Sequence, residues 1–399
     1  MQTEVKPKPR LKFIDMARSF AILLMLEGHF TGATLGNEYR DYQYPLYKFW
    51  HLLHGLTSPL FFTVTGLIFV YLLIGKENIP FNQNIRVRKG IKRISQLIFW
   101  GYFIQLNLWT IGKSIYYGTQ FYLDWFFAFH VLQSIGFGLA IVILIYRIYR
   151  WINKGPIYLY YLIGGATMFV FYGMMKAYII ADEKMIAEGL QQTRNYWPHG
   201  APAVIQNMFY GPYSDFSFVR MSGYTILGGA LGALIKINEH NVRKLWFCIT
   251  VILSGLLLAI MAKPILIHID TFIEWIGLTE NGTLWYNATS ISRFGQVVVL
   301  IGILMLVDKY IDVKAPLFLK IGQTTFPVYV VHVIILYGGI FGFGLKPYVF
   351  DRNLSPYAAI AISATAIAFF AVMVKYIEPL EKIYDSVLIF LRIKKRKQD

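Results

Sequence analysis

Apolar residues occur along this chain in long blocks, and the shorter segments between the blocks carry most of the charges. Each block approaches the ~20 residues that a helix needs to cross the hydrocarbon core of a bilayer. These blocks show neither the alternation of apolar and polar residues that is typical of a half-buried strand nor the apolar stripe of an amphipathic helix. We therefore predict an all-α fold, a polytopic integral membrane helical bundle with about ten transmembrane helices. The expected spans are residues 12–34, 52–75, 93–112, 125–147, 157–179, 217–236, 245–263, 292–309, 317–342 and 356–377.

The segments between the spans show no division into domains, because no internal repeat, low-complexity tract or Ser/Gly-rich linker interrupts the chain. We expect a single transmembrane domain over residues 1–399, with an N-terminal arm at 1–11 and a basic tail at 380–399. The connections 180–216 and 264–291 are unusually long, which is typical of functional lids or acceptor-binding surfaces and equally of packed structural caps.

The distribution of cations predicts the orientation in the membrane. The chain is 56% hydrophobic and 15% charged, with 38 Lys and Arg residues and a net charge of +16. With a cytoplasmic N-terminus, the inner segments hold 26 of these cations and the outer segments 11, so both termini are placed in the cytoplasm. Anionic lipids of the inner leaflet then account for the net charge. No nucleic-acid partner is expected, because no folded basic domain accompanies the basic tail.

The chain is cysteine-poor. Its single cysteine, Cys248, excludes an intrachain disulfide and a cysteine-cluster metal site, and no metal is expected. The compact, cysteine-poor sequence favours a multi-pass protein of a bacterial inner (plasma) membrane.

The ionisable residues of the first span include Asp15, Arg18 and His29. Arg18 and His29 are eleven residues apart, which places them on one helix face roughly 16 Å from each other. Buried ionisable groups are costly in a membrane and point to function. A cation near one surface, aligned with an imidazole near the other, suggests a long anionic donor with the reach of a pantetheine arm.

Polar residues on other spans are expected at the depth of His29, in the outer part of the membrane. Such residues tend to face the bundle interior or a wet cavity, so a shared polar pocket is plausible. Interhelical hydrogen bonds are the plainer explanation for Gln105, Asn107 and His130 taken singly. The residues at this level are Gln105, Asn107, His130, Gln133 and His332.

The inner surface carries five cations from Arg86 to Arg93, where the third span begins. Backbone N–H groups at a helix N-terminus and arginine side chains both donate to phosphate oxygens. Juxtamembrane cations are also the ordinary topology signal. With Arg18 on the same side, we interpret Arg88, Lys89 and Arg93 as candidate donor-binding residues.

This arrangement permits acyl transfer from a thioester. His29 is a candidate to take the proton of an attacking hydroxyl or amine, or to be acylated first, and the sequence leaves both routes open. Candidate oxyanion donors are the amides of Gln133, Gln105 and Asn107, and the second histidine, His332. Glu27 lies ~200° around the helix from His29, so it is expected to face elsewhere.

Four stretches together resemble the transmembrane acyltransferase superfamily, in its branch similar to heparan-α-glucosaminide N-acetyltransferase, with acyltransferase-3 proteins as cousins. They are Phe13-Ile14-Asp15-Met16-Ala17-Arg18 through Gly28-His29, Pro59-Leu60-Phe61-Phe62-Thr63-Val64-Thr65-Gly66, Val131-Leu132-Gln133-Ser134-Ile135-Gly136, and Gly322-Gln323 through Tyr329-Val330-Val331-His332. A weaker match runs from Gly223-Tyr224 to Gly228-Gly229-Ala230-Leu231-Gly232.

The resemblance implies transfer of an acyl group, commonly acetyl, from cytosolic acyl-CoA (acetyl-CoA) to an outer-side acceptor, commonly a glycan amine or hydroxyl. It implies that His29 is the catalytic histidine and that Arg18, with the basic segment around Arg88 and Arg93, handles coenzyme A. Ser19 departs from the family pattern, in which a glycine usually follows the arginine.

Two other functions are compatible with the same residues. A transporter or exporter of a glycan or small polar solute would use the polar pocket for binding and would need no coenzyme A. Transporters often contain broken helices in matched halves. Here Thr325-Phe326-Pro327 is a candidate break in the ninth span, but no matching half is apparent. A non-catalytic membrane scaffold would make the alignment of Arg18 with His29 accidental.

Overall fold

The computed structural model describes residues 11–75, 79–119, 124–278 and 282–390. Helices account for 78% of the structure, and the described residues contain isolated β-bridges but no strand. The predicted all-α fold is therefore confirmed. These residues form two compact units, one from residues 11–54, 313–337 and 344–390, and the other from the described residues of 55–312 and 338–343.

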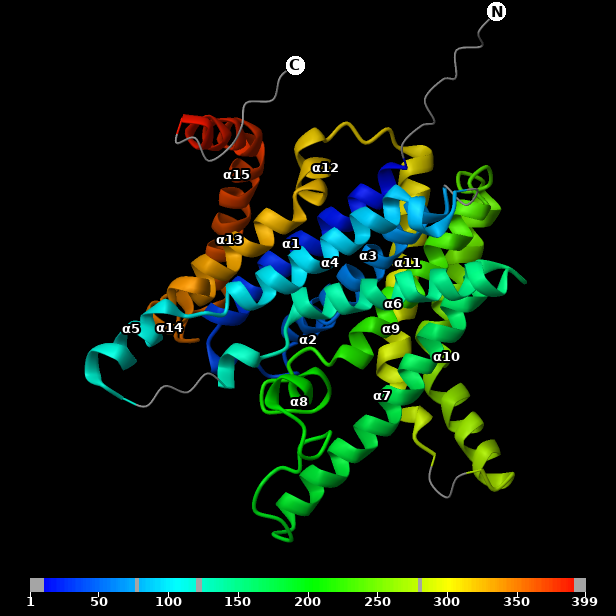
Figure 1. Cartoon of the computed structure of the whole chain (residues 1–399), viewed down its shortest axis with the longest axis horizontal. Coiled ribbons are helices and arrows are strands. Elements are labelled where there is room, and N and C mark those ends of the chain that lie inside the picture. The colour runs from blue at the N-terminus through cyan, green and yellow to red at the C-terminus, as the bar shows by residue number, and fades with distance from the viewer. Residues whose placement is uncertain (1–10, 76–78, 120–123, 279–281, 391–399) are drawn as a thin grey trace, which may run out of the picture. The chain divides into compact units, whose positions relative to one another are not determined.

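The first unit joins the two ends of the described chain (Figure 1). Helix α1 packs against α12, α13 and α15, which follow it by about 300 residues. Its helices are α1 (Lys12–Thr34), α2 (Pro45–His54), α12 (Pro316–Gln323), α13 (Thr325–Tyr337), α14 (Leu345–Tyr348) and α15 (Pro356–Phe390), with a 3-10 turn, η1 (Asn37–Tyr39).

The break predicted near Thr325 is present. Helix α12 ends at Gln323, α13 begins at Thr325, and the two axes differ in direction by 77°. Pro327 lies in the first turn of α13, where its missing N–H is not needed for the helical ladder. The bend allows α12 and α13 each to pack against α1.

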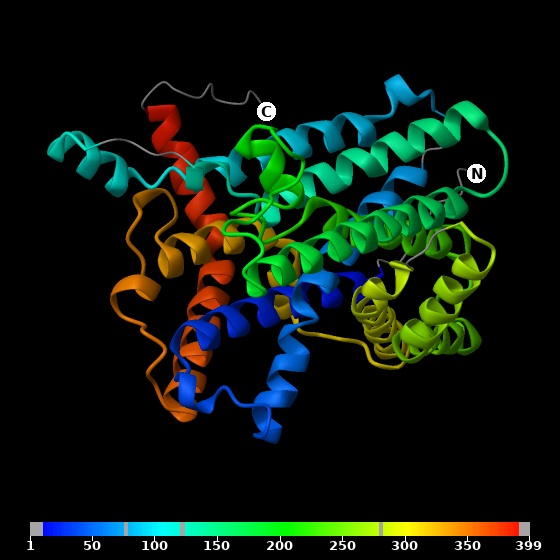
Figure 2. The same cartoon turned by 90° about the horizontal axis from the view of Figure 1, so that it is seen from below.

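The second unit contains the remaining helices. They are α3 (Thr57–Ile74), α4 (Ile85–Phe103), α5 (Leu108–Tyr117), α6 (Val131–Ile152), α7 (Ile157–Ala187), α8 (Ala203–Phe209), α9 (Phe218–Ile237), α10 (Leu245–Trp275) and α11 (Ala288–Tyr310), with the 3-10 turns η2 (Phe81–Gln83), η3 (Asp124–Phe127), η4 (Leu284–Asn287) and η5 (Gly339–Phe341). Figure 2 shows α10 and α11 packed side by side, and Figure 1 shows them running in opposite directions.

Glycines bring helices of the second unit into backbone contact. A Cβ atom on Gly66 of α3 would overlap the carbonyl oxygen of Thr225, and one on Gly228 of α9 would overlap that of Thr63. Small residues at such positions let membrane helices approach closely. The weak family match around Gly228 therefore corresponds to the α3–α9 contact.

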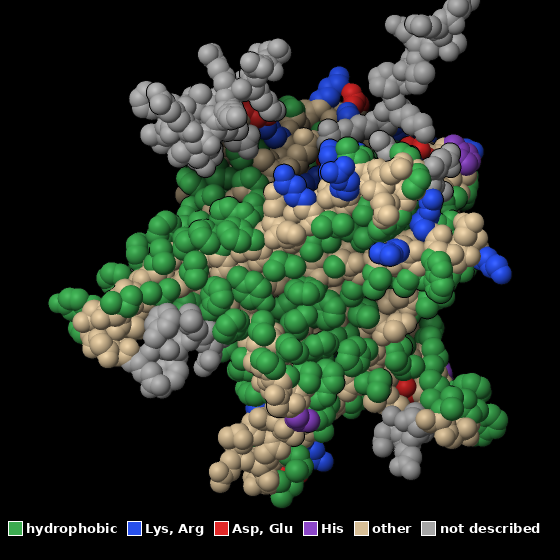
Figure 3. Space-filling model, viewed as in Figure 1, with side chains coloured by type: hydrophobic (Ala, Val, Ile, Leu, Met, Phe, Trp, Pro, Cys, Tyr) green, Lys and Arg blue, Asp and Glu red, His purple; other side chains and the backbone are tan. Residues whose placement is uncertain are grey.

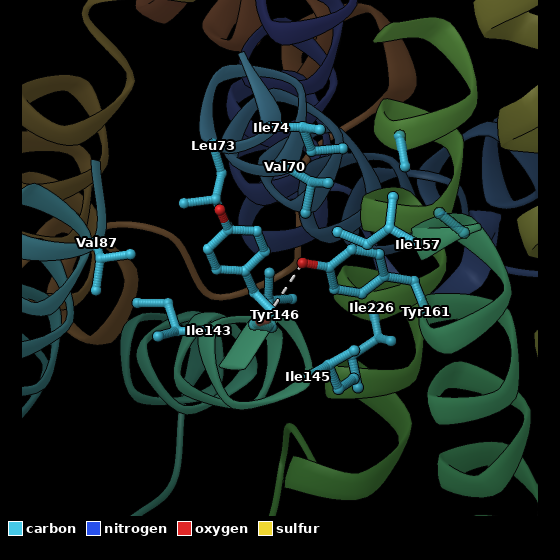
Figure 4. Close-up of a cluster of buried hydrophobic side chains, with 13 residues drawn as sticks. Val70, Leu73, Ile74, Val87, Ile143, Ile145, Tyr146, Ile157, Tyr161 and Ile226 are labelled. Carbon is cyan, nitrogen blue, oxygen red and sulfur yellow. Dashed lines mark hydrogen bonds between the residues drawn. The ribbon is translucent and has the colours of Figure 1, made fainter. Parts of the chain in front are cut away.

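The core of this unit is formed by α3, α4, α6, α7 and α9 around two buried tyrosines, Tyr146 and Tyr161 (Figure 4). The Tyr161 hydroxyl donates to the carbonyl of Val142 at 3.3 Å, so its polar atom is satisfied within the apolar cluster. Hydrophobic side chains also cover much of the surface in view in Figure 3. Such a surface fits contact with lipid.

The described residues contain fewer segments that qualify as membrane spans than the ten predicted. Seven described helical segments are long and apolar enough to cross a membrane, and the bent pair α12–α13 makes an eighth. Helices α1 and α4 have 23 and 19 residues, but the charged side chains that they carry make them less apolar. The seven are Pro45–Ile74, Val131–Ile152, Ile157–Ala187, Phe218–Ile237, Leu245–Trp275, Leu284–Tyr310 and Pro356–Glu378.

Several predicted boundaries were wrong. The span 93–112 is divided, because Asn107 adopts a left-handed backbone conformation between α4 and α5. The predicted loops 180–216 and 264–291 are partly helical, since α7 continues to Ala187, α10 continues through Pro264 to Trp275, and α8 lies in the first loop. Helix α15 runs past the predicted span to Phe390. Most of the N-terminal arm, residues 1–10, and the end of the basic tail, residues 391–399, lie outside the described residues.

Candidate functional site

Two histidines from opposite ends of the chain meet in the first unit. Nδ1 of His29 on α1 lies 3.1 Å from Nε2 of His332 on α13, and the ring centroids are 5.1 Å apart. His332 is fully buried, and Tyr329 packs edge-on against it. Because one nitrogen must donate and the other accept, the contact sets the tautomers of both rings together.

Helix α2 supplies a second set of aromatic and imidazole groups. The rings of Trp50 and His54 are stacked, 5.3 Å apart and nearly parallel. The indole N–H of Trp50 donates to Glu27 on α1 at 2.8 Å, and Glu27 also accepts from Thr31. Glu27 therefore anchors the residue that stacks on His54.

His54 packs directly on the backbone of α1. A Cβ atom on Gly28 would overlap Nδ1 and Cε1 of His54, so this approach requires a residue without a side chain. The His54 and His29 rings are 6.5 Å apart. His29 thus supplies one imidazole, and Gly28 leaves the space in which the imidazole of His54 lies beside it.

These groups line a cavity of about 370 Å³ within the first unit. His29, His51 and His54 contribute imidazoles to its wall, and Tyr47, Trp50 and Tyr337 contribute aromatic rings. The Tyr337 ring meets His29 edge-on at 5.7 Å. A concave site with aromatic walls and a few polar groups is typical of small-molecule binding.

Asp15 and Arg18 lie at the other end of α1, where α12 packs. Arg18 Nη1 is 3.9 Å from Asp15 Oδ1, and the Gln323 amide donates to Asp15 at 3.5 Å. Ser19 accepts from the backbone N–H of Gly322 at 3.0 Å and contacts the carbonyl oxygens of Asp15 and Phe318. The residue that departs from the family pattern thus joins α1 to α12.

Gln105 and Gln133 meet in the second unit. With the Gln105 amide oriented to satisfy its neighbours, its oxygen accepts from Gln133 Nε2 at 3.0 Å and its nitrogen donates to Phe126 O at 2.8 Å. Gln133 is fully buried and packs on Gly101 of α4. Gln105 and Gln133 thus form a hydrogen-bonded pair.

The other two predicted acceptor-binding residues of this unit have structural contacts. Asn107 caps α5 by accepting from Thr110 N at 3.0 Å. His130 precedes α6, and its Nδ1 lies 3.5 Å from Asp215 Oδ2. Burial lowers the pKa of His130, and the charge of Asp215 opposes this shift. Contact of either residue with an acceptor stays a prediction.

The predicted donor-binding cations of α4 lie on different faces of the helix. Arg88 and Lys89 are exposed, whereas Arg86 and Arg93 are half-buried and seven residues apart, which places both on one face. Asn84 caps the start of α4 by accepting from Arg86 N at 2.9 Å. Their contact with coenzyme A stays a prediction.

The sequence analysis missed several residues of the cavity. His51 and His54, with Trp50, occupy adjacent turns of α2, and this spacing of imidazole and indole groups beside the first span was the available signal. No local pattern marked the cations of the cavity wall, which come from three separate segments. The missed residues are Arg40, Tyr47, Trp50, His51, His54, Tyr337, Lys346 and Arg352.

Comparison with known proteins agrees with the resemblance seen in the sequence. Residues 10–198 match the family model described as heparan-alpha-glucosaminide N-acetyltransferase, catalytic, and no curated protein matches the chain. The match includes α1 with Arg18 and His29, all of α2, and Gln133, and it ends before His332. This match supports a likeness of residues 10–198 to the heparan-α-glucosaminide N-acetyltransferase-like branch of the membrane acyltransferase superfamily.

Proposed function

We propose that this protein transfers an acetyl group from cytosolic acetyl-CoA to an amine or hydroxyl of a sugar on the outer side of the membrane. The observation that carries the proposal is the His29–His332 pair, in which an imidazole in a cavity wall is held by a buried partner. The family match over residues 10–198 supports the same class of reaction.

His29 has two available roles. When His332 accepts from Nδ1–H of His29, the lone pair of His29 is at Nε2. As a base, Nε2 of His29 takes the proton of the acceptor. The amine nitrogen or hydroxyl oxygen of the acceptor bonds at the same time to the thioester carbonyl carbon. The carbon–sulfur bond then breaks, and the proton passes to the leaving thiolate. In the second route, Nε2 itself takes the acetyl group and passes it to the acceptor.

Arg18, with Asp15 as its partner, is our candidate for the donor side, together with Arg88, Lys89 and Arg93. Arg18 precedes His29 by eleven residues of α1, roughly 16 Å, and this separation supports a long donor lying along the helix. Guanidinium groups suit the phosphates of coenzyme A because they donate in pairs to phosphate oxygens. With both termini cytoplasmic, these cations face the cytosolic pool.

Gln133 is our candidate for stabilising the oxyanion, because its buried amide carries N–H donors. Gln105, Asn107 and His130 are candidates for contact with the acceptor. The bond between Gln105 and Gln133 supports treating these two amides as a pair.

The first test is His29→Ala in purified protein, with acetyl-CoA binding and acetyl transfer to amino sugars measured side by side. Transfer should fall by about 100-fold or more, the usual contribution of a general base, while acetyl-CoA still binds. The exposed His240 supplies the matched control, His240→Ala, which should behave as wild type. Normal transfer by His29→Ala would contradict the assigned role.

The donor side is tested with Arg18→Gln, and the exposed Arg243 supplies the control Arg243→Gln. The dissociation constant of acetyl-CoA should rise in the first variant only. An unchanged constant would remove Arg18 from the donor site. In proteoliposomes, acceptor flux without consumption of acetyl-CoA would favour the transporter and overturn the enzyme proposal.

A further inference from the structure

One face of α10 carries a row of exposed apolar side chains. Of the apolar membrane-spanning stretch of α10, 22% is buried, compared with 50% for the segment that contains α11, and Figures 1 and 2 show α10 at the edge of the second unit. Ile249, Leu253, Leu256 and Ile260 follow one another at intervals of three or four residues, so they share one face. Their exposed fractions run from 39% to 69%. These four residues are called the apolar stripe below.

The contact of α10 with α11 uses a different face. A Cβ atom on Gly255 would overlap backbone atoms of Gly295 and Val299, so the two helices touch through their backbones. Ser292 of α11 also donates to Ala259 O at 2.7 Å. Gly255 and Ala259 lie roughly 90–130° around the helix from the middle of the apolar stripe. Packing on α11 therefore leaves the stripe exposed.

The apolar stripe leads to a cavity of about 370 Å³ at the C-terminal end of α10. Lys263, Asp270 and Glu274 line this cavity from the helix. Their spacing from Ile260 places them on the continuation of the stripe. Trp285, in the turn η4, lines the cavity from the opposite side. The cavity thus combines a cation, two carboxylates and an indole ring.

Backbone N–H groups hold both carboxylates in the cavity wall. One oxygen of Asp270 accepts from Leu284 N at 3.0 Å, and the other accepts from Trp285 N at 2.8 Å. Glu274 accepts from Gly282 N. A carboxylate oxygen has two lone pairs, so Asp270 can still accept from a ligand. Two negative charges are therefore fixed about one helical turn apart.

Trp285 adds an aromatic surface beside these carboxylates. Its side chain is 40% exposed, and its ring stacks on that of Tyr286 with the centroids 4.2 Å apart. The face of an indole attracts an ammonium group. This part of the cavity therefore suits a cation that also donates hydrogen bonds.

Apolar and charged groups follow a fixed order along this face of α10. The apolar stripe comes first, Lys263 comes next, and Asp270 and Glu274 come last. An aminophospholipid has the complementary order, from acyl chains through an anionic phosphate to a terminal ammonium. Lys263 and Asp270 are seven residues apart, roughly 10 Å along the axis, and the long lysine side chain can cover part of that distance. A free sugar or an inorganic anion would use only part of this pattern.

We propose that this face of α10 binds phosphatidylethanolamine, a zwitterionic phospholipid with a primary ammonium group. The acyl chains lie on the apolar stripe, and Lys263 contacts the phosphate. Asp270, Glu274 and Trp285 surround the ammonium. The site shares no residue with the cavity that contains His29, so it does not depend on the proposed function. The proposed orientation of the chain assigns this lipid to the outer leaflet.

The test is native mass spectrometry of the purified protein with phosphatidylethanolamine, phosphatidylcholine and phosphatidylglycerol that carry identical chains. Wild type should bind phosphatidylethanolamine about tenfold more tightly than the other two, because only a primary ammonium donates charge-assisted hydrogen bonds to the carboxylates. Glu274→Gln keeps an acceptor for Gly282 N and should remove this preference. Lys263→Gln should weaken the binding of all three lipids, since each has a phosphate. The exposed Glu188 and Lys154 supply the matched controls Glu188→Gln and Lys154→Gln.

Three outcomes would overturn the proposal. Equal affinity of wild type for phosphatidylethanolamine and phosphatidylcholine would remove the ammonium site. Wild-type binding by both Lys263→Gln and Glu274→Gln would place the lipid elsewhere. Displacement of the lipid by glucosamine but not by glycerophosphoethanolamine would assign the cavity to a soluble sugar. Acetyl transfer is measured in none of these experiments, so their outcome is independent of the proposed enzyme.

Phosphatidylethanolamine with a photoactivatable acyl chain tests the apolar stripe in nanodiscs. Cross-links should form several times more often on the stripe than on α15, where Ile360 and Val372 are also exposed. Glu274→Gln should reduce this excess, because the head group is no longer held. Equal labelling of α10 and α15 in wild type would indicate contact with bulk lipid alone and would contradict the site.

Discussion

Nδ1 of His29 lies 3.1 Å from Nε2 of His332, although 303 residues separate the two histidines in the chain. The contact joins α1 to α13 and leaves His29 in the wall of the cavity while His332 is buried behind it. His332 therefore acts on the proposed reaction through His29, as a positioning residue.

His332→Ala should lower kcat by about 100-fold, because the ring of His29 loses the partner that sets its tautomer and orientation. His332→Gln retains a hydrogen-bonding group and should recover part of the rate. The midpoint of the pH–rate profile should move in His332→Ala, since the group bonded to His29 has changed. Leu336→Ala, at an equally buried position of α13, should leave that midpoint in place. The same midpoint in all three variants would leave His332 with a packing role alone.

Gly28→Ala should lower transfer although alanine favours helix by about 1 kcal/mol over glycine. The added Cβ would overlap the His54 ring and displace it, together with the stacked Trp50, from the cavity wall. Acetyl-CoA binding should persist. Gly112→Ala is the control, because a Cβ there meets no atom within 4 Å. Wild-type activity in Gly28→Ala would show that the position of His54 is unimportant for transfer.

Ser19→Ala should lower the thermal stability of the protein in detergent, because the Gly322 N–H would lose its acceptor in a buried contact. A buried donor left unsatisfied costs about 1–3 kcal/mol. Ser95→Ala removes one exposed hydrogen bond, to Ile91, and should have little effect. Equal melting temperatures for the two variants would contradict a role of Ser19 in joining α12 to α1.

Glu27→Ala should reduce transfer, since Trp50 and Thr31 both donate to this carboxylate. Glu27→Gln keeps a carbonyl acceptor and should retain most of the activity. Glu188→Ala, which removes an exposed partner of Lys184, serves as the control. If Glu27→Gln is as impaired as Glu27→Ala, the negative charge, and not the hydrogen bond to Trp50, is what the site requires.

Local sequence patterns predicted those parts of the structure that depend on neighbouring residues. The apolar blocks predicted helices, and Pro327 marked the bend between α12 and α13, because proline limits backbone geometry wherever the chain goes. The division at Asn107 was missed, since the left-handed conformation of one asparagine has no periodic signal. The extension of α10 through Pro264 was missed because a proline usually indicates the end of a helix.

The sequence by itself determined that this is an all-α membrane protein and that Arg18 and His29 share a face of one helix, because hydrophobic period and helical geometry are local properties. The tertiary structure alone decided that His332 bonds to His29, that His54 lies on Gly28, and that Arg40 and Arg352 line one cavity. These contacts join residues from distant segments, and only the packing of whole helices brings such segments together.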